Sequence, residues 1–314
     1  MMRAARRCVI LLTLVTAQAN SQGIPSIPRQ DTTIEFLGSR DQYELITGIF
    51  ESTYITALSG WGSQGDRLFF EGTIAPNLSF AGRHFAIVGT PKIVLRMYDE
   101  HSNPVRRPSY MPGAHLYWWG KPTQINSRPG FPFARLTLWN HHSNGQDGEF
   151  YNDSTDDINT RDGSFSLNFM ELSGGWISLD RDGNGFGTAR IGLRANLPIN
   201  EADPLRHSKG DQYGSYRFIA GGSGNATRKW VAASLAAELQ YVLDSRYQYN
   251  PYFSTDRLTT SVSLLYSLKQ LQNAGILVNG FWGQDYYNMS YKQRFWAARL
   301  GFAFNATTTF LAPR

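Results

Sequence analysis

The sequence predicts an all-β protein, a transmembrane antiparallel β-barrel of about twelve strands, on three observations. Short segments alternate between apolar and polar residues, as strands do when one face meets lipid and the other a polar lumen. Aromatic residues make up 14% of the chain, and tyrosine and tryptophan recur beside these segments. After the N-terminal segment, no stretch approaches the roughly 18 continuous apolar residues of a transmembrane helix. A helical membrane protein is therefore excluded.

The N-terminus has the order of a secretory signal. Three arginines precede an apolar run at 9–15, and small residues follow at 17–19. We predict a signal peptide at 1–19, an N-terminal periplasmic extension at 20–47 and a barrel domain at 48–314. The single cysteine, Cys8, lies in the signal, so the mature protein has no disulfide. The formal net charge of +5 includes the signal arginines, and it indicates no nucleic-acid partner.

The clearest strand patterns lie toward the C-terminus, at 230–241, 258–268 and 296–304. In the first of these, Leu235 and Leu239 share one face, while Glu238 and Gln240 share the other. Nine weaker strands complete an even count, at 50–59, 66–80, 83–98, 109–119, 131–143, 163–179, 186–194, 211–221 and 274–284.

The connections between these strands alternate between short turns and long polar loops. The long loops are predicted at 99–108, 144–162, 195–210 and 242–255. In bacterial outer-membrane barrels, short turns face the periplasm and long loops face outward. The fifth strand, 131–143, is therefore expected to end level with the outer leaflet of the outer membrane.

That strand ends with His141 and Ser143, which are two positions apart. Strand side chains alternate in direction, so both point to one face, roughly 7 Å apart along the backbone. An imidazole beside a serine hydroxyl is the core of nucleophilic acyl transfer. His142 faces the other way, and we interpret it as a hydrogen-bonding residue of the lumen.

The alternation within this strand contains one conflict. Trp139 has the phase of His141 and Ser143, but Arg135 and Thr137 share that phase too. Without a change of phase, Arg135 and Thr137, which are polar and expected in the lumen, would point to the same face as His141 and Ser143. A β-bulge near Leu138 would reconcile the two halves of the strand.

The stretch 140–145, Asn-His-His-Ser-Asn-Gly, resembles the active-site motif Asn-His-x-Ser-Asn-Gly of the outer-membrane phospholipase A family. Segments at 102–106, 109–112 and 278–304 are similar to further family segments. The resemblance implies a twelve-stranded barrel in the bacterial outer membrane, with its active site toward the outer leaflet. It also implies phospholipase A1 or A2 activity on membrane phospholipids and a homodimeric active state that uses Ca²⁺.

The resemblance also implies roles for individual residues. Ser143 is expected to be the nucleophile and His141 the base, while the backbone N–H of Gly145 stabilises the oxyanion. An asparagine on the next strand, Asn168, is expected to orient His141. The link to this asparagine is longer than usual by about a dozen residues, so Asn152 and Asn159 stay open for the same role. The expected calcium ligands are Ser102, Asp147 and Glu149.

Two other functions stay open at this stage. A lipid A deacylase would use the same His-x-Ser pair with an acidic third member, such as Glu149. A porin or adhesion barrel would keep the scaffold without catalysis. Against an open pore, the polar faces of the strands carry large residues that crowd a barrel of this size, namely Arg217, Glu238, Gln240 and Arg299.

Overall fold

The computed structural model describes most of the barrel region of the chain. The described residues are 39–50, 53–62, 68–98, 105–125, 128–152, 157–180, 185–199, 202–206, 213–227, 231–243, 255–268, 274–304 and 307–311. The expected signal at 1–19 and the expected calcium ligand Ser102 lie outside these ranges.

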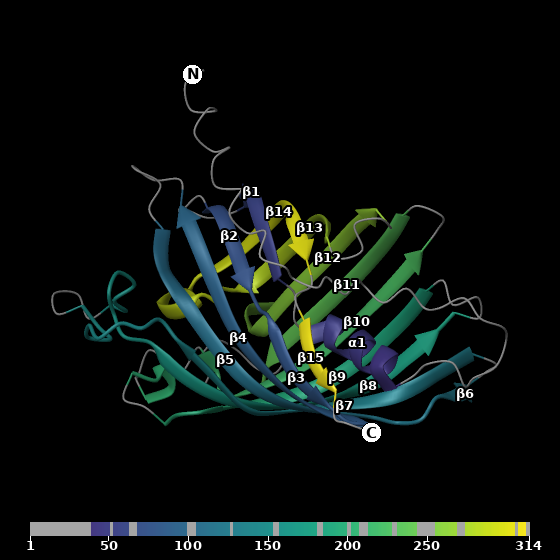
Figure 1. The fold of residues 1–314 in the computed structure, drawn as a ribbon. Coiled ribbons are helices and arrows are strands. Elements are labelled where there is room, and N and C mark those ends of the chain that lie inside the picture. Colours follow the sequence, from purple (N-terminus) through teal and green to yellow (C-terminus); the bar gives the residue numbers. More distant parts are fainter. Residues whose placement is uncertain are drawn as a thin grey trace, which may run out of the picture.

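The chain forms a closed barrel with twelve antiparallel strand positions, which confirms the predicted fold class (Figure 1). The strands follow one another around the wall, and β14 pairs with β1 to close it. β2 and β3 pair with successive parts of β4, so together they fill one position, interrupted at 75–76. The short β6 extends the ladder beside β7, and β15 pairs in parallel with β3.

The elements have the following bounds: α1 (Ser39–Phe50), β1 (Thr53–Gly62), β2 (Leu68–Ile74), β3 (Asn77–Ala81), β4 (Phe85–Tyr98), β5 (Val105–Trp119), β6 (Thr123–Ile125), β7 (Arg128–Ser143), β8 (Ser166–Leu179), β9 (Gly185–Leu197), η3 (Pro204–Arg206), β10 (Tyr216–Thr227), β11 (Val231–Val242), η5 (Thr255–Arg257), β12 (Leu258–Leu268), β13 (Ala274–Gln284), η6 (Asn288–Lys292), β14 (Arg294–Phe304) and β15 (Thr307–Leu311).

Antiparallel strands place every second connection at the same end of the barrel. The longer connections, which include 144–165, 198–215 and 285–293, form what we call the long-loop end, at the left of Figure 1. The opposite end, where 82–84 and 180–184 connect strands, is the short-turn end. Several predicted boundaries were wrong by a few residues: β5 begins earlier than expected, and β10 begins and ends later.

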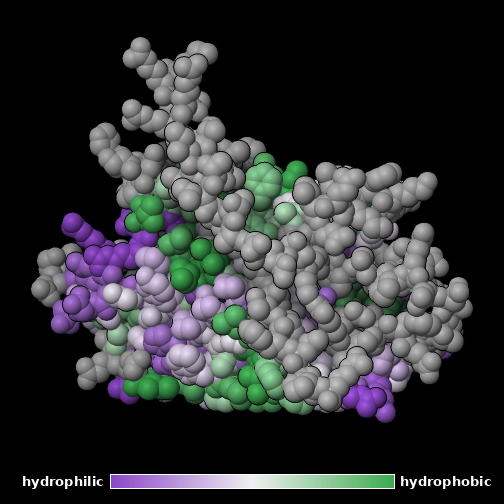
Figure 2. Space-filling model, viewed as in Figure 1, coloured by the Kyte–Doolittle hydropathy of each residue, from purple (hydrophilic) through white to green (hydrophobic). Residues whose placement is uncertain are grey.

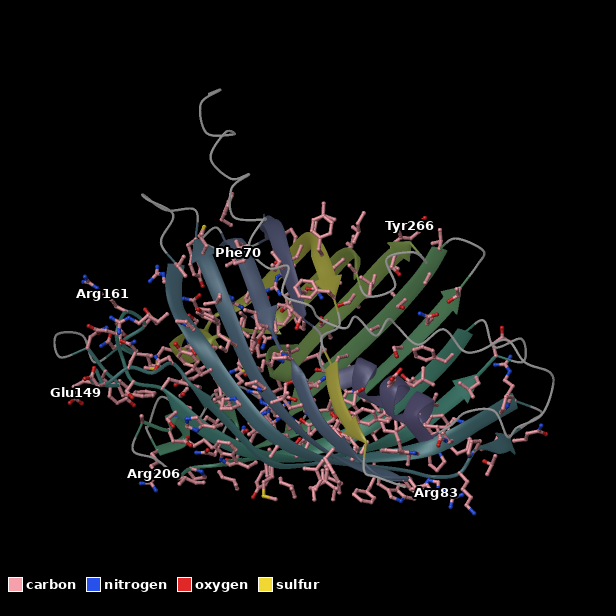
Figure 3. The ribbon with its side chains drawn as sticks, in the orientation of Figure 1. Phe70, Arg83, Glu149, Arg161, Arg206 and Tyr266 are labelled. Carbon is pink, nitrogen blue, oxygen red and sulfur yellow. The ribbon has the colours of Figure 1, made fainter. Side chains whose placement is uncertain are left out.

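The outer face of the wall is apolar, as the alternation predicted. Leu235, Val262, Leu300 and Phe302 are exposed, whereas Arg299, next to Leu300 in the chain, is buried in the lumen. Figure 2 shows hydrophobic residues along the lower wall, between hydrophilic residues at its two ends. In the same orientation, Figure 3 places Arg206 at one end of this wall and Arg83 at the other. Such a band between polar ends is the outer surface that a bilayer requires.

The lumen near the long-loop end is filled by paired charges. Glu71 accepts hydrogen bonds from Arg96 at 2.7 Å and from Arg299 at 2.9 Å. Arg96 also contacts Asp285 at 2.8 Å. A separate ion pair joins Arg194 of β9 to Glu171 of β8 at 2.7 Å. Because these charges are buried, each needs its partner to offset the cost of leaving water. The network leaves a lumen cavity of about 510 Å³.

The lumen near the short-turn end is apolar and holds α1. Tyr43, Leu45 and Ile46 of this helix are buried against an apolar cluster from the inner faces of several strands. The members of that cluster on the wall include Tyr117, Trp119, Phe131, Phe133, Ile177 and Leu179. The helix was not predicted from the sequence. Among the described residues, no helix has the length and hydropathy needed to span a bilayer.

Candidate active site

β7 contains a β-bulge at Leu138, which confirms the bulge inferred from the sequence. Its pairing with β5 and with β8 shifts between Thr137 and the residues that follow Leu138. As a result Leu138 and Trp139 are both exposed, at 46% and 45%. The strand therefore changes phase, because two consecutive side chains now point outward.

The phase change decides which side chains face outward at the long-loop end. Before the bulge, Arg135 and Thr137 are buried in the lumen; after it, Asn140 and His142 are buried instead. His141 and Ser143 are partly exposed on the outer face of the wall. The apolar outer surface continues on β8 through Met170 and Leu172, beyond Asn168, which pairs with His141.

His141 contacts Asn168, which lies directly opposite it on β8. The His141 Nδ1 and Asn168 Oδ1 atoms are 3.1 Å apart. Because the amide oxygen only accepts, Nδ1 must carry the proton, so Nε2 is left free to accept one. The hydrogen bond from Ser143 to this ring is not formed among the described residues; such contacts commonly tighten only when substrate binds.

The chain after Ser143 turns sharply at Gly145, which has a φ of 65°. The Asn144 side chain fixes this turn: its amide donates to the Gly163 carbonyl at 2.8 Å, and its oxygen accepts from the Phe165 amide at 3.0 Å. The backbone amide before Gly145, that of Asn144, donates to the Phe165 carbonyl, and the one after it, that of Gln146, donates to the Asn144 side-chain oxygen. Within the described ranges the Gly145 amide has no acceptor, so it can donate to a ligand.

Asn144 and Trp139 were not assigned roles from the sequence. The Asn-Gly pair is a turn signal that could have indicated the first. The indole Nε1 of Trp139 donates to Asn168 Oδ1 at 3.1 Å, and its ring stacks on His141. No local pattern indicated that contact, because it depends on the bulge.

The two other candidate asparagines lie in the loop between β7 and β8. The Asn159 side chain donates to the Glu149 carbonyl at 3.2 Å and to Asp162 at 2.6 Å, so it is occupied within the loop. The backbone amide of Asn152 bonds to the Asp157 carbonyl. Of the three asparagines, only Asn168 contacts His141 among the described residues.

The expected acidic ligands do not gather around the site. Asp147 and Glu149 are exposed, and Figure 3 shows Glu149 and Arg161 at the outer edge of the loop, directed away from the barrel. Within the described ranges, no three His, Cys, Asp or Glu side chains lie close enough together to hold a metal ion. The acidic part of the expected calcium site is therefore not assembled by the described residues of one chain.

A second cluster of histidine, serine and asparagine lies on the lumen side of the same strand. We call His142, Ser109 and Asn288 the inner cluster, and His141, Ser143 and Asn168 the outer cluster. His142 Nε2 lies 3.2 Å from Ser109 Oγ, and Ser109 Oγ donates to Asn288 Oδ1. All three inner residues are buried. The inner cluster joins β7 to β5 and to the connection that carries η6.

No family model matches the sequence, and no curated protein matches it. Solved structures do match, with a TM-score of 0.54 to outer membrane phospholipase A from Escherichia coli, at 14% identity over 82% of this chain and 90% of that one. An asparagine-to-alanine active-site mutant of that enzyme gives a TM-score of 0.52 at 13% identity, with the same shares covered. The outer membrane phospholipase dimer of Salmonella typhi with bound calcium gives 0.51 at 14% identity, over 82% of this chain and 91% of that one. At these identities the likeness establishes the fold, which points to an outer-membrane protein.

Proposed function

We propose that this protein is an outer-membrane phospholipase that hydrolyses acyl ester bonds of glycerophospholipids with Ser143, His141 and Asn168. One observation carries the proposal. His141 on the bulged strand β7 contacts Asn168 on β8 at 3.1 Å on the outer face of the wall, and Ser143 points to the same face. The fold shared with outer membrane phospholipase A supports it, as does the active-site mutant of that enzyme, in which an asparagine is replaced by alanine.

In the proposed acylation step, Ser143 Oγ attacks the ester carbonyl while His141 Nε2 takes its proton. Asn168 holds Nδ1–H, so the ring presents its unprotonated nitrogen to the serine. The imidazolium then returns the proton to the departing alcohol, which leaves as a lysophospholipid. Water hydrolyses the acyl-enzyme by the same proton transfers in reverse order and releases a fatty acid.

The developing oxyanion has a suitable donor in the Gly145 amide. A donor already fixed in place stabilises the transition state without having to reorient during the reaction. The positive φ of 65° and the two bonds made by Asn144 support a rigid turn here. Tyr110 lies close against this turn, since a Cβ added to Gly145 would meet its ring at 3.4 Å.

The outward direction of the site fits a substrate that arrives from the plane of the bilayer. Ser143 lies at the end of a strand whose outer face is apolar, so acyl chains could stay in contact with an apolar surface while the ester reaches the hydroxyl. This position belongs at the outer leaflet if the long loops face outward, as they do in bacterial barrels.

The geometry gives less support to the other functions considered. A deacylase with Glu149 as its acidic member needs that carboxylate beside His141, but Glu149 is exposed and directed away from the barrel. For a porin, the lumen is crowded: α1 packs inside one end, and Arg217 with Arg299 contributes to the polar network at the other.

Calcium and a homodimer form a separate part of the proposal, supported by the Salmonella typhi phospholipase structure, which is a dimer with bound calcium. Since Asp147 and Glu149 do not converge, no catalytic step is assigned to the ion here. We expect hydrolysis to stop in chelator and to rise with protein density in detergent. Equal rates in calcium and in chelator at every protein concentration would remove both the ion and the dimer.

The test of the proposed reaction uses the full mature barrel refolded in detergent. Release of fatty acid and lysophospholipid from phospholipid micelles is measured by mass spectrometry for the wild type, Ser143→Ala and His141→Ala. Ser178→Ala is the matched control, because Ser178 lies on the same β7–β8 ladder at the opposite end of the barrel. We expect hydrolysis by the wild type and the control alone. Undiminished hydrolysis by Ser143→Ala would overturn the proposal.

A further inference from the structure

Trp139 is the second of the two consecutive residues that the bulge exposes on the outer face of β7. It lies two residues before His141, and 45% of it is exposed. Its indole N–H does not point toward water or headgroups. It donates to Asn168 Oδ1 at 3.1 Å, although Asn168 itself is buried.

Asn168 Oδ1 therefore accepts two hydrogen bonds of the same length, one from Trp139 Nε1 and one from His141 Nδ1. A carbonyl oxygen has two lone pairs, so both bonds can form together. The indole N–H can only donate, so the amide must present its oxygen on this side. A flipped amide would bring its NH₂ group against the indole N–H, and would face His141 Nδ1 with a donor. His141 would then carry its proton on Nε2, where it cannot accept the proton of Ser143.

Trp139 also supports the ring of His141 directly. The two ring centroids are 5.8 Å apart and the planes are inclined by 12°, which is a stacked arrangement. An aromatic face within about 6 Å attracts a cation. The contact thus favours the imidazolium that forms during proton transfer over the neutral ring.

We infer that Trp139 is a positioning residue of the active site: it fixes the orientation of the Asn168 amide, and through it the tautomer of His141. This inference rests on the proposed function. The competing account is that Trp139 is one more aromatic residue of the membrane interface, where tryptophan is common in barrels. Trp296 provides the comparison, because it is equally exposed, at 48%, and lies near the same end of the barrel on β14.

The test is a double-mutant cycle between Trp139→Phe and Asn168→Ala in the refolded full barrel. Phenylalanine keeps a ring to stack on His141 but has no N–H. We expect Trp139→Phe to lower kcat about ten-fold with KM unchanged, as the loss of one hydrogen bond to a buried acceptor suggests. In the Asn168→Ala background the same change should have no further effect, because the amide that it orients is already absent. Trp139→Leu should cost more than Trp139→Phe, since stacking is lost as well.

Trp296→Phe is the matched control and should leave kcat unchanged. An unchanged kcat in Trp139→Phe would overturn the inference, as would a ten-fold loss that persists in full in the Asn168→Ala background. Should Trp139→Phe fail to fold, Trp139→Tyr takes its place in the same cycle. The activities of the wild type and of Ser143→Ala show which of the two proposals has failed. An inactive wild type, or an active Ser143→Ala, overturns the proposed function itself. If the wild type is active and Ser143→Ala is inactive, the double-mutant cycle tests the role of Trp139 alone.

Discussion

The outer and inner clusters contain the same three residue types on opposite faces of one wall, yet their hydrogen bonds run in different directions. In the outer cluster Asn168 accepts from His141, so the free ring nitrogen can take a proton from serine. In the inner cluster the Ser109 hydroxyl donates to Asn288, which leaves it to accept from His142. A serine that accepts from histidine is not activated as a nucleophile. The direction of the donors, together with exposure, distinguishes a reactive site from a structural contact.

The largest contrast is expected from removing each serine in turn. Ser143→Ala should reduce ester hydrolysis by about a thousand-fold or more, because the covalent step is lost. Ser109→Ala should leave hydrolysis within about ten-fold of the wild type. It should lower the free energy of unfolding by about 1–3 kcal/mol, since the buried His142 and Asn288 lose a partner. Hydrolysis and thermal unfolding in detergent measure the two effects. A folded Ser109→Ala barrel as inactive as Ser143→Ala would break the distinction.

The next test exchanges the two faces. Inserting one alanine between Asn140 and His141 should move His141 opposite Leu167, so that His141 and Ser143 turn into the lumen. We expect hydrolysis to fall at least about a hundred-fold because substrate in the bilayer no longer reaches the serine. Deleting Leu138 is the matched control: it removes the residue that the bulge adds, leaves both side chains facing outward and should keep activity. The heat-modifiable mobility of the folded barrel on gels confirms folding, and a folded insertion variant with full activity would contradict the assignment of the faces.

A smaller effect is expected at Asn168. Asn168→Ala removes the acceptor for His141 Nδ1–H but takes no group away from the proton transfer itself. We expect kcat to fall about ten- to hundred-fold, less than for Ser143→Ala. Asn152→Ala, in the loop, should be nearly neutral. If Asn152→Ala is the damaging change of the two, the third member of the outer cluster has been assigned to the wrong residue.

The smallest effect concerns a buried carboxyl near the outer cluster but outside it. Burial raises the pKa of Asp203 to about 6, from its usual value near 4. The neighbouring carbonyl of Ala202 accepts from the Ser166 amide, at the start of β8. Protonated Asp203 stabilises this packing below pH 4, and the contribution is lost as the pH rises through about 6.

Asp203→Asn should therefore raise the free energy of unfolding by about 1 kcal/mol at pH 8 and leave it unchanged at pH 4. The asparagine keeps an oxygen to accept from the Leu205 amide, a bond of 2.8 Å in the native loop. Thermal unfolding at the two pH values measures the difference, and hydrolysis should not change. A stabilisation that is the same at both pH values would show that the charge of Asp203 is not its cause.

The sequence was most informative where the two faces of a strand differ in polarity. Exposed apolar residues stand at every second position in β12 and β14, as predicted, at Val262, Leu264 and Tyr266 and at Leu300, Phe302 and Phe304. It was least informative for α1 and the strand ends around it. Tyr117, Trp119, Phe131 and Phe133 face the lumen there, but the outer face is apolar too, so periodicity could not tell inside from outside. The helix itself spans 12 residues, and its burial depends on a cluster that five separate strands supply.

For the site, spacing alone placed His141 and Ser143 on one face, and the conflict of phase at Trp139 located the bulge. Asn168 was expected only through the resemblance to the phospholipase family, with Asn152 and Asn159 left open. The pairing of β7 with β8 places it opposite His141, although a connection of 22 residues separates the two strands. The contact from Trp139 to Asn168 could not be read in advance, because it depends on how far the bulge rotates the indole. The inner cluster combines residues from β5, β7 and η6, which no local pattern relates.

The bulge in β7 also has a genetic consequence. Leu138 corresponds to a single codon, and the ladders on both sides of it stay paired from Phe133 to Thr137 and again from Asn140 to Ser143. The bulge takes up this one residue, so a gene that lacks the codon would still encode a His-x-Ser that faces lipid, whereas one further codon inserted after it would turn the pair toward the lumen. Related genes that encode the same wall can therefore differ by an aligned gap at this one triplet and keep access to the bilayer.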